Sequence, residues 1–207
     1  MSQGLDVTQW QEQLVDACAS GDEARAGALV AQPGSRKARA LLEAMLAHPN
    51  ALVRQAAVWE LGALGGASSA RRLEQQLAIE EARGDYDGSS VADAISQALG
   101  RIEDADARTT LMRRLQRLAS GKPDPGDVGT VVHALWRRRH PELLPAIRKT
   151  LELLTPPAPR SLLGLLTLLE KSPEEPRSWL GDMSMRMSFH GLEDQAASRP
   201  GETEGWI

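Results

Sequence analysis

The sequence predicts an all-α fold made of repeated helical hairpins, and three observations support this prediction. Apolar residues recur at spacings of three and four from Val7 to Leu169, as they do along one face of a helix. The same stretch contains no convincing alternation of apolar and polar residues, which is the pattern that predicts a strand. Residues 53–64 also align without a gap to residues 91–102, so that the pattern repeats after 38 residues.

The first two helices are expected close to the start of the sequence. Asp6, with Gln9 three residues later, is a suitable cap for the first helix. Ser20 and Glu23 have the spacing of a capping box, in which each side chain bonds to the backbone N–H of the other residue. We therefore expect the second helix to begin after Ser20. The apolar residues of the first helix are Val7, Trp10, Leu14 and Ala17.

Two apolar stripes define the middle of the predicted repeats. The sequence His48-Pro49 interrupts the helical pattern, and a helix with apolar residues from Val53 to Leu64 follows it. A cleaner stripe runs from Val91 to Ile102. Ser90 precedes this second stripe, and Asp93 lies within it at the spacing of a capping box. We therefore expect the helix to begin after Ser90.

The later helices keep the apolar spacing and have prolines at their expected starts. Further shifts of 37 and 34 residues bring Val128 and Leu162 onto the same stripe. Pro125 follows Asp124 and Pro141 follows His140. Each proline would occupy the first helical position, where its missing N–H costs nothing.

The helical body is expected to end near Glu170. This gives a helical repeat domain over residues 1–170 and a C-terminal tail over residues 171–207. A short helix is expected to run from Ser172 towards Leu180. The rest of the tail is poor in aliphatic residues, so we expect an extended or disordered segment there.

One repeat carries the motif of a known family. A proline at position 49 is followed by Val53-Arg54, by Ala56-Ala57 and by Leu61-Gly62. This pattern resembles the turn and second helix of a HEAT repeat, and residues 90–102 resemble it with Ala92 in place of the arginine. The resemblance implies a right-handed, armadillo-type α-solenoid of about four stacked hairpins, because one repeat cannot bury its apolar face alone. It also implies an adaptor or scaffold that binds proteins.

Composition indicates a cytoplasmic protein of bacterial origin. Arg outnumbers Lys by 20 to 4, a bias that we associate with GC-rich bacterial genomes. The single Cys18 cannot form an internal disulfide, and no signal-peptide pattern opens the sequence. The longest apolar stretch, residues 162–169, is far shorter than the ~20 residues that a membrane-spanning helix needs. We expect no association with a membrane.

The chemically active residues do not form a pattern that predicts catalysis. The four His and one Cys are scattered, with neither a Cys-x-x-Cys pair nor two His one helical turn apart. Cys18 is expected to be a buried and unreactive thiol. His133 is expected at the surface and His140 at a helix cap. We therefore expect no enzymatic activity, no metal site and no cofactor.

Basic groups keep a nucleic-acid alternative open, since some HEAT-like proteins are glycosylases that act on alkylated DNA. Such an enzyme would need a basic groove, whereas the pI of this sequence is about 5.6. The basic groups are Arg71-Arg72, Arg113-Arg114-Arg117 and Arg137-Arg138-Arg139. We favour the interpretation that they are solvated helix faces paired with Asp and Glu. The group Arg137-Arg138-Arg139 is retained as a candidate contact for a partner.

Two tryptophans lie on the second helices of predicted hairpins, the helices that line the concave surface in HEAT solenoids. Trp136 fits its apolar stripe and is expected in the core. Trp59 lies off the stripe of its helix and is expected to be exposed, where it would anchor a protein interface. Arg54 would suit the rim of that interface, although the resemblance favours a structural hydrogen bond between repeats.

The helix expected at residues 162–169 is apolar nearly all round and needs a cover. The tail could provide it through Trp179 and a set of alternating apolar residues that would share one side of an extended segment. A second protein could provide it instead, and if that protein were a second copy of the chain it would give self-association through residues 162–189. The alternating residues are Met183, Met185, Met187 and Phe189.

The sequence as a whole favours a binding module whose partner is another protein. A bacterial toxin-neutralising or effector-handling protein is the most specific form of this expectation. The alternative from a different class is a HEAT-like DNA-binding or DNA-alkylation-repair enzyme.

Overall fold

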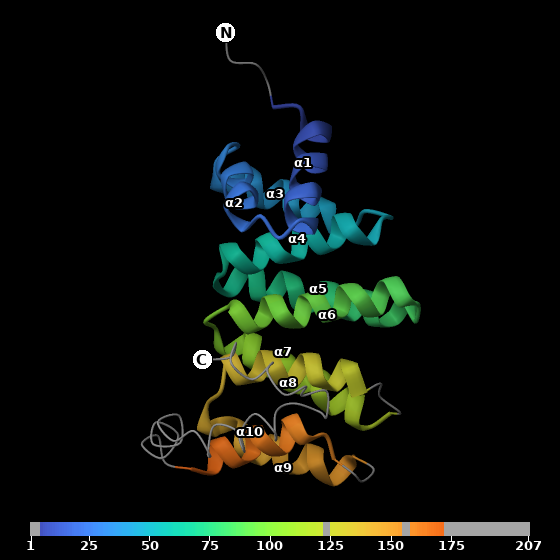
Figure 1. Cartoon of the computed structure of the whole chain (residues 1–207), viewed down its shortest axis with the longest axis vertical. Helices are drawn as coiled ribbons and strands as arrows, with labels where there is room; N and C mark the ends of the chain where they lie inside the picture. The colour runs from blue at the N-terminus through green and yellow to red at the C-terminus, as the bar shows by residue number, and fades with distance from the viewer. Residues whose placement is uncertain (1–4, 122–124, 155–157, 172–207) are drawn as a thin grey trace, which may run out of the picture. The chain divides into compact units, whose positions relative to one another are not determined.

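The computed structural model describes residues 5–121, 125–154 and 158–171 (Figure 1). These residues form ten α-helices and one short 3-10 helix, and they contain no strand, so the predicted all-α class is confirmed. None of these helices is long and apolar enough to span a bilayer. The helices are α1 Val7–Ala19, α2 Glu23–Ala31, α3 Ser35–Met45, α4 Ala51–Leu64, α5 Gly66–Arg83, α6 Tyr86–Arg101, α7 Ala105–Ala119, α8 Pro125–Arg137, η1 Pro141–Leu143, α9 Leu144–Leu153 and α10 Arg160–Glu170.

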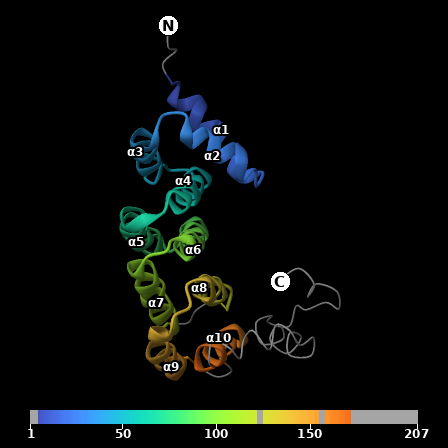
Figure 2. The same cartoon turned by 90° about the vertical axis from the view of Figure 1, so that its left-hand side faces the viewer.

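The chain divides into two compact units, Met1–Arg108 and Thr109–Ile207. In the first unit, α3 and α5 lie in one layer, and α4 and α6 lie side by side in a second layer (Figure 2). The hairpin of α1 and α2 packs against α4. Fully buried aliphatic side chains fill the space between these helices and form the core of the unit. They include Leu14, Leu42, Leu61, Leu73, Ile95 and Leu99.

The parallel helices α4 and α6 approach closely because a glycine stands at their contact. A Cβ placed on Gly62 would lie 2.8 Å from the Cβ of Ala98. Further along the same pair, the Gln55 side-chain amide donates a hydrogen bond of 2.7 Å to the Ser90 hydroxyl. The two small residues therefore set the spacing of the helices, and the polar pair aligns them along their length.

The predicted start of α1 is confirmed, whereas that of α2 is wrong. Asp6 accepts hydrogen bonds from the backbone N–H groups of Thr8 and Gln9. For α2 the cap is Asp22, whose carboxylate accepts from the N–H of Arg25. The Ser20 hydroxyl instead donates to carbonyls of the last turn of α1, so it completes the end of one helix rather than the start of the next.

The predicted start of α6 is also wrong. The helix begins five residues earlier than expected, at Tyr86, because Asp85 caps it by accepting a 2.6 Å hydrogen bond from the N–H of Gly88. Gly84 ends α5 in the left-handed conformation, with φ of 66°. That conformation suits glycine, which has no Cβ, and allows the short turn between the two helices.

The second unit contains α7 from Thr109 onward, α8, η1, α9 and α10, with α10 packed against both α8 and α9. The predicted proline starts are confirmed, since Pro125 begins α8 and Pro141 begins η1. His140 caps η1, and its Nδ1 accepts a hydrogen bond from the N–H of Glu142. The helix α10 ends at Glu170, as expected. The predicted domain limits of 1–170 stay a prediction, and the tail helix towards Leu180 lies outside the described residues.

Candidate protein-binding site

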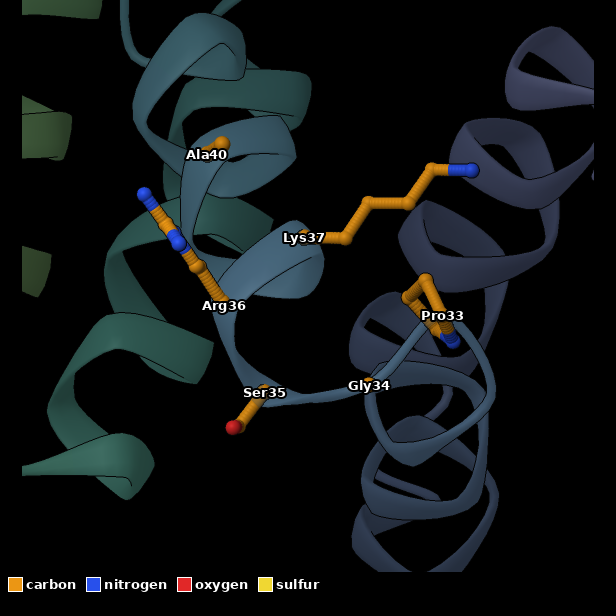
Figure 3. Close-up of a pocket in the computed structure, with 6 residues that line it drawn as sticks. All are labelled: Pro33, Gly34, Ser35, Arg36, Lys37 and Ala40. Carbon is orange, nitrogen blue, oxygen red and sulfur yellow. The ribbon is translucent and has the colours of Figure 1, made fainter.

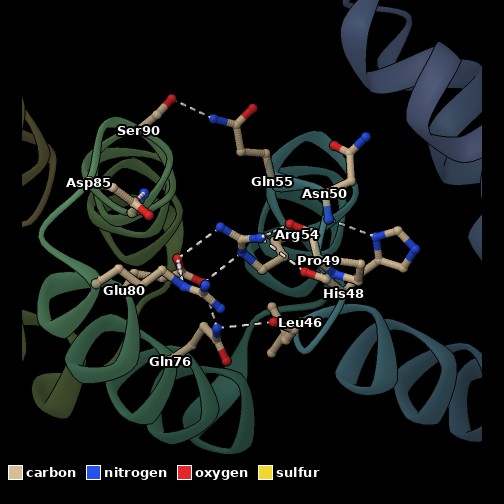
Figure 4. Close-up of polar contacts among 12 residues, drawn as sticks. Leu46, His48, Pro49, Asn50, Arg54, Gln55, Gln76, Glu80, Asp85 and Ser90 are labelled. Carbon is tan, nitrogen blue, oxygen red and sulfur yellow. Dashed lines mark hydrogen bonds and ion pairs between the residues drawn. The ribbon is translucent and has the colours of Figure 1, made fainter.

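A buried ion pair supports the N-terminal end of α4. The Nε of Arg54 lies 2.8 Å from Oε1 of Glu80 on α5, and its Nη2 donates to Oε2 at 3.2 Å (Figure 4). The Nη1 of the same guanidinium donates to the carbonyls of His48 and Pro49, at 2.9 and 2.8 Å. Arg54 therefore holds the turn between α3 and α4 against α5.

Two further side chains complete the surroundings of Glu80. The Gln76 amide donates to Oε1 of Glu80 at 2.7 Å and to the carbonyl of Leu46 at 3.0 Å, as Figure 4 shows. The Nε of Arg83 lies 2.9 Å from Oε2. Arg54 is 1% exposed and Glu80 is fully buried, so neither presents its charged group to a partner. This geometry agrees with a structural role for Arg54 rather than a place on an interface rim.

Trp59 lies on α4 at the surface of the same unit and is half-buried. The guanidinium carbon of Arg101, at the end of α6, lies 5.4 Å from the centroid of its ring, which is within the range of a cation–π interaction. The Nη2 of Arg101 lies 3.3 Å from Oε1 of Glu23, at the start of α2. Three helices thus contribute to a group that we call the Trp59 cluster, consisting of Trp59, Arg101 and Glu23.

A buried carboxyl group lies next to this cluster. Glu60 follows Trp59 on α4, and the Cys18 thiol on α1 is 3.9 Å from its Oε1. Burial raises the pKa of Glu60, and Glu23 raises it further, while the hydrogen bond from Cys18 and the charge of Arg101 oppose the shift. Removal of this carboxyl from water therefore favours its protonated form.

Cys18 is half-buried, and its thiol is held in the neutral form. Burial raises its pKa to about 12, and the negative charge of Glu60 and the hydrogen bond to that carboxyl act in the same direction. Because the thiolate is the nucleophilic form of cysteine, this environment makes the group unreactive at neutral pH. The described part of the chain also contains no cluster of His, Cys, Asp and Glu that could hold a metal ion.

A shallow, open depression lies at the connection of α2 and α3 and includes two basic residues, Arg36 and Lys37 (Figure 3). Their side chains point to opposite sides of the first turn of α3 in that view, so they do not converge on one ligand. The remaining lining residues are Pro33, Gly34, Ser35 and Ala40, none of which has an ionisable side chain. The depression therefore offers no defined binding site.

The basic group at the end of α8 is partly directed toward its own helix. Arg137 is exposed and Arg138 is half-buried. The Nη1 of Arg139 donates a 2.9 Å hydrogen bond to the carbonyl of Trp136, which fixes its guanidinium against the end of α8. Trp136 is 8% exposed, so its predicted place in the core is confirmed. Arg114, from another of the basic groups, is 2% exposed and is no surface contact.

The remaining candidates from the sequence belong to the tail and lie outside the described residues. They are Trp179, Met183, Met185, Met187 and Phe189.

Sequence reasoning singled out Trp59 but missed the groups that surround it. Glu23 and Arg101 are 78 residues apart, and only the folded structure brings them together. A local signal did exist for the buried pair, because Gln76, Glu80 and Arg83 follow one another at helical spacings of four and three. Nothing in that pattern, however, distinguishes a buried network from an exposed polar face.

Neither family models, curated proteins nor solved structures show a significant match to this chain. The resemblance to HEAT repeats therefore depends on the residues that carry it, from His48 to Ile102. Arguments about function have to start from the geometry of the chain itself.

Proposed function

We propose that this chain is a protein-binding module, an adaptor or scaffold rather than an enzyme, and that the Trp59 cluster is the centre of its binding surface. The observation that carries the proposal is a half-buried tryptophan at the surface with an arginine from a second helix over its ring, which in turn pairs with a glutamate from a third helix. Trp and Arg are the residues most enriched among those that dominate the binding energy of protein interfaces.

The fixed position of Trp59 lowers the cost of binding. An interface side chain that is mobile before binding loses about 0.5–1.5 kcal/mol when a partner immobilises it. Arg101 lies over the ring of Trp59 and also pairs with Glu23, so the side chains of the Trp59 cluster are already largely ordered before a partner binds. Glu23 retains a side chain that is 81% exposed, which leaves a polar rim beside the aromatic anchor.

The architecture that we propose for this function is a right-handed HEAT-type α-solenoid. The layers of alternate helices, with α4 beside α6 and α8 beside α10, support this proposal within each unit. In such a stack the layer that contains α4 and α6 would line the concave surface, and Trp59 belongs to α4. We further propose a bacterial, cytoplasmic setting and a role in neutralising a toxin or handling an effector.

Affinity capture tests the proposal. The tagged full-length protein, Trp59→Ala and Ile79→Ala would each be used to capture partners from the native cell, with a high-salt wash and mass spectrometry. Ile79 is 49% exposed on α5, in the other layer, and serves as the matched control. We expect one stoichiometric protein with the wild type and the control, and about thirtyfold weaker binding with Trp59→Ala, equivalent to about 2 kcal/mol.

Other results of this experiment would contradict the proposal. Equal recovery with all three proteins would exclude Trp59 from the interface. Recovery of nucleic acid would favour the DNA-repair alternative, which predicts salt-sensitive DNA binding that disappears when Arg137, Arg138 and Arg139 are replaced together by Ala. Absence of DNA binding at low salt would remove that alternative.

A further inference from the structure

The last turn of helix α10 is less buried than the earlier part of the same helix face. Leu162 and Leu165 are fully buried on the side that packs against α8 and α9. Leu169 follows them by seven and four residues, so it lies on the same face of the helix. It is nevertheless only half-buried, and so is Leu168. The described residues therefore leave the inner face of the last turn without a complete cover.

The outer side of α10 adds to this apolar surface. Leu163 is 38% exposed there, and Leu166 is half-buried. A salt bridge of 2.7 Å between Arg148 and Glu170 lies at the end of the helix and gives the surface a polar border. We call the partly exposed leucines of α10 its exposed leucine surface, and an apolar patch bordered by charges is typical of a site that another segment occupies. These leucines are Leu163, Leu166, Leu168 and Leu169.

The chain itself continues directly from this surface. After Lys171 the sequence has 36 more residues. The eleven residues of α10 extend over about 16 Å, whereas an extended chain covers about 3.3 Å per residue. A segment that begins some ten residues after Lys171 can therefore reach any point along α10.

Charge complementarity supports the same occupant. Residues 109–171 contain eleven Arg or Lys and five Asp or Glu. Residues 172–207 contain three Arg or Lys and seven Asp or Glu. The two parts thus carry opposite net charges, which favours their association and makes it sensitive to salt.

We propose that residues 183–189 of the same chain bind to the exposed leucine surface of α10 and cover its last turn. Met183, Met185, Met187 and Phe189 alternate with polar residues, so an extended segment would present all four to the leucines. Methionine adapts to irregular apolar surfaces because it is unbranched and flexible. The tail then acts as an intramolecular cap for the second unit, which is independent of any partner at Trp59.

Hydrogen exchange of the α10 amides in the full-length protein tests this proposal. One variant carries Met185→Ser, Met187→Ser and Phe189→Ser. The control carries Leu192→Ser, Trp206→Ser and Ile207→Ser, which remove the same number of apolar residues from the tail outside the segment. We expect about tenfold faster exchange in the last turn of α10 for the first variant and no change for the control. High salt should speed the same amides in the wild type.

Repeating the hydrogen-exchange measurement over a hundredfold range of protein concentration shows whether the tail of the same chain or a second copy of the chain covers α10. Protection that is independent of concentration and lost only in the first variant supports an intramolecular cap. Protection that increases with concentration would assign the surface to a second copy and overturn the proposal. Equal exchange in all three proteins would overturn it as well.

Discussion

Arg54 and Glu80 form an ion pair in which the side chains are 1% and 0% exposed. A charged pair so far from water is stable only when its remaining hydrogen-bonding groups are also satisfied. Two backbone carbonyls accept from Arg54, Gln76 donates to Glu80, and Arg83 forms a second ion pair with the same carboxylate. The pair therefore acts as the centre of a network that joins α4, α5 and the turn before α4.

Replacement of Arg54 by Met is expected to lower the free energy of unfolding by about 3–5 kcal/mol, because it leaves the buried Glu80 carboxylate without its main partner. Arg83→Met is the control, since Arg83 contacts the same carboxylate with a side chain that is 36% exposed. Its loss should cost about 1 kcal/mol or less. Urea unfolding of both variants measures the difference, and equal destabilisation would show that burial of Arg54 is not the cause.

The double variant Arg54→Met with Glu80→Leu separates pairing from packing. It removes both charges, so no uncompensated buried carboxylate remains. We expect it to be more stable than Arg54→Met alone, although the carbonyls of His48 and Pro49 lose their donor. A double variant that is less stable than the single variant would indicate that the network, rather than the charge pair, determines stability.

Close contact of α4 with α6 predicts a second stability effect. In Gly62→Ala the new Cβ would meet the Cβ of Ala98 at 2.8 Å and force the helices apart, at a cost of about 1–3 kcal/mol. Gly27→Ala in α2 is the matched control, since nothing lies within 4 Å of its Cβ position. Alanine should stabilise that helix by about 0.5–1 kcal/mol. Thermal unfolding should show shifts of opposite sign, and two stabilising substitutions would disprove the close contact.

Helices with strong apolar periodicity could be predicted from the sequence, and so could the burial of Trp136. The errors lie at helix starts, where more than one nearby residue has a side chain that could cap the helix. Ser20 and Asp22 are both good caps, and the chain uses Asp22 because the Ser20 hydroxyl is already bonded to the end of α1. Asp85 likewise caps α6 ahead of Ser90, which bonds to Gln55 instead. Sequence spacing alone does not show which of two possible capping residues the folded chain uses.

The surroundings of Trp59 were beyond sequence reasoning for a different reason. Glu23 and Arg101 become neighbours only because the α1–α2 hairpin packs against α4 and because α6 lies beside α4. No periodicity records a contact between residues so far apart. Glu60 was also missed, since a glutamate next to a tryptophan that is expected at the surface would ordinarily be expected in water.

Burial of Glu60 predicts a pH dependence of stability. Its pKa is raised in the folded state, so folding favours the protonated carboxyl. The contribution of the protonated Glu60 carboxyl to the free energy of unfolding is fully present below the ordinary pKa of 4.5. It is lost as the pH rises through the folded-state pKa. In Glu60→Gln the neutral side chain keeps this stability at every pH. The difference in unfolding free energy between Glu60→Gln and wild type should therefore grow from pH 4 to pH 8 in urea titrations, and a constant difference would contradict the raised pKa.

The same buried contact predicts that Cys18 resists alkylation. A pKa of about 12 instead of 9.0 lowers the thiolate population at pH 8 about a thousandfold, because each pKa unit is a factor of ten. Iodoacetamide should therefore modify the folded protein far more slowly than the protein unfolded in urea. Glu60→Gln removes the negative charge but leaves the burial, which is the larger cause. Its thiol should thus react faster than that of the wild type and more slowly than in the unfolded chain, whereas equal rates for folded wild type and variant would show that Glu60 does not act on Cys18.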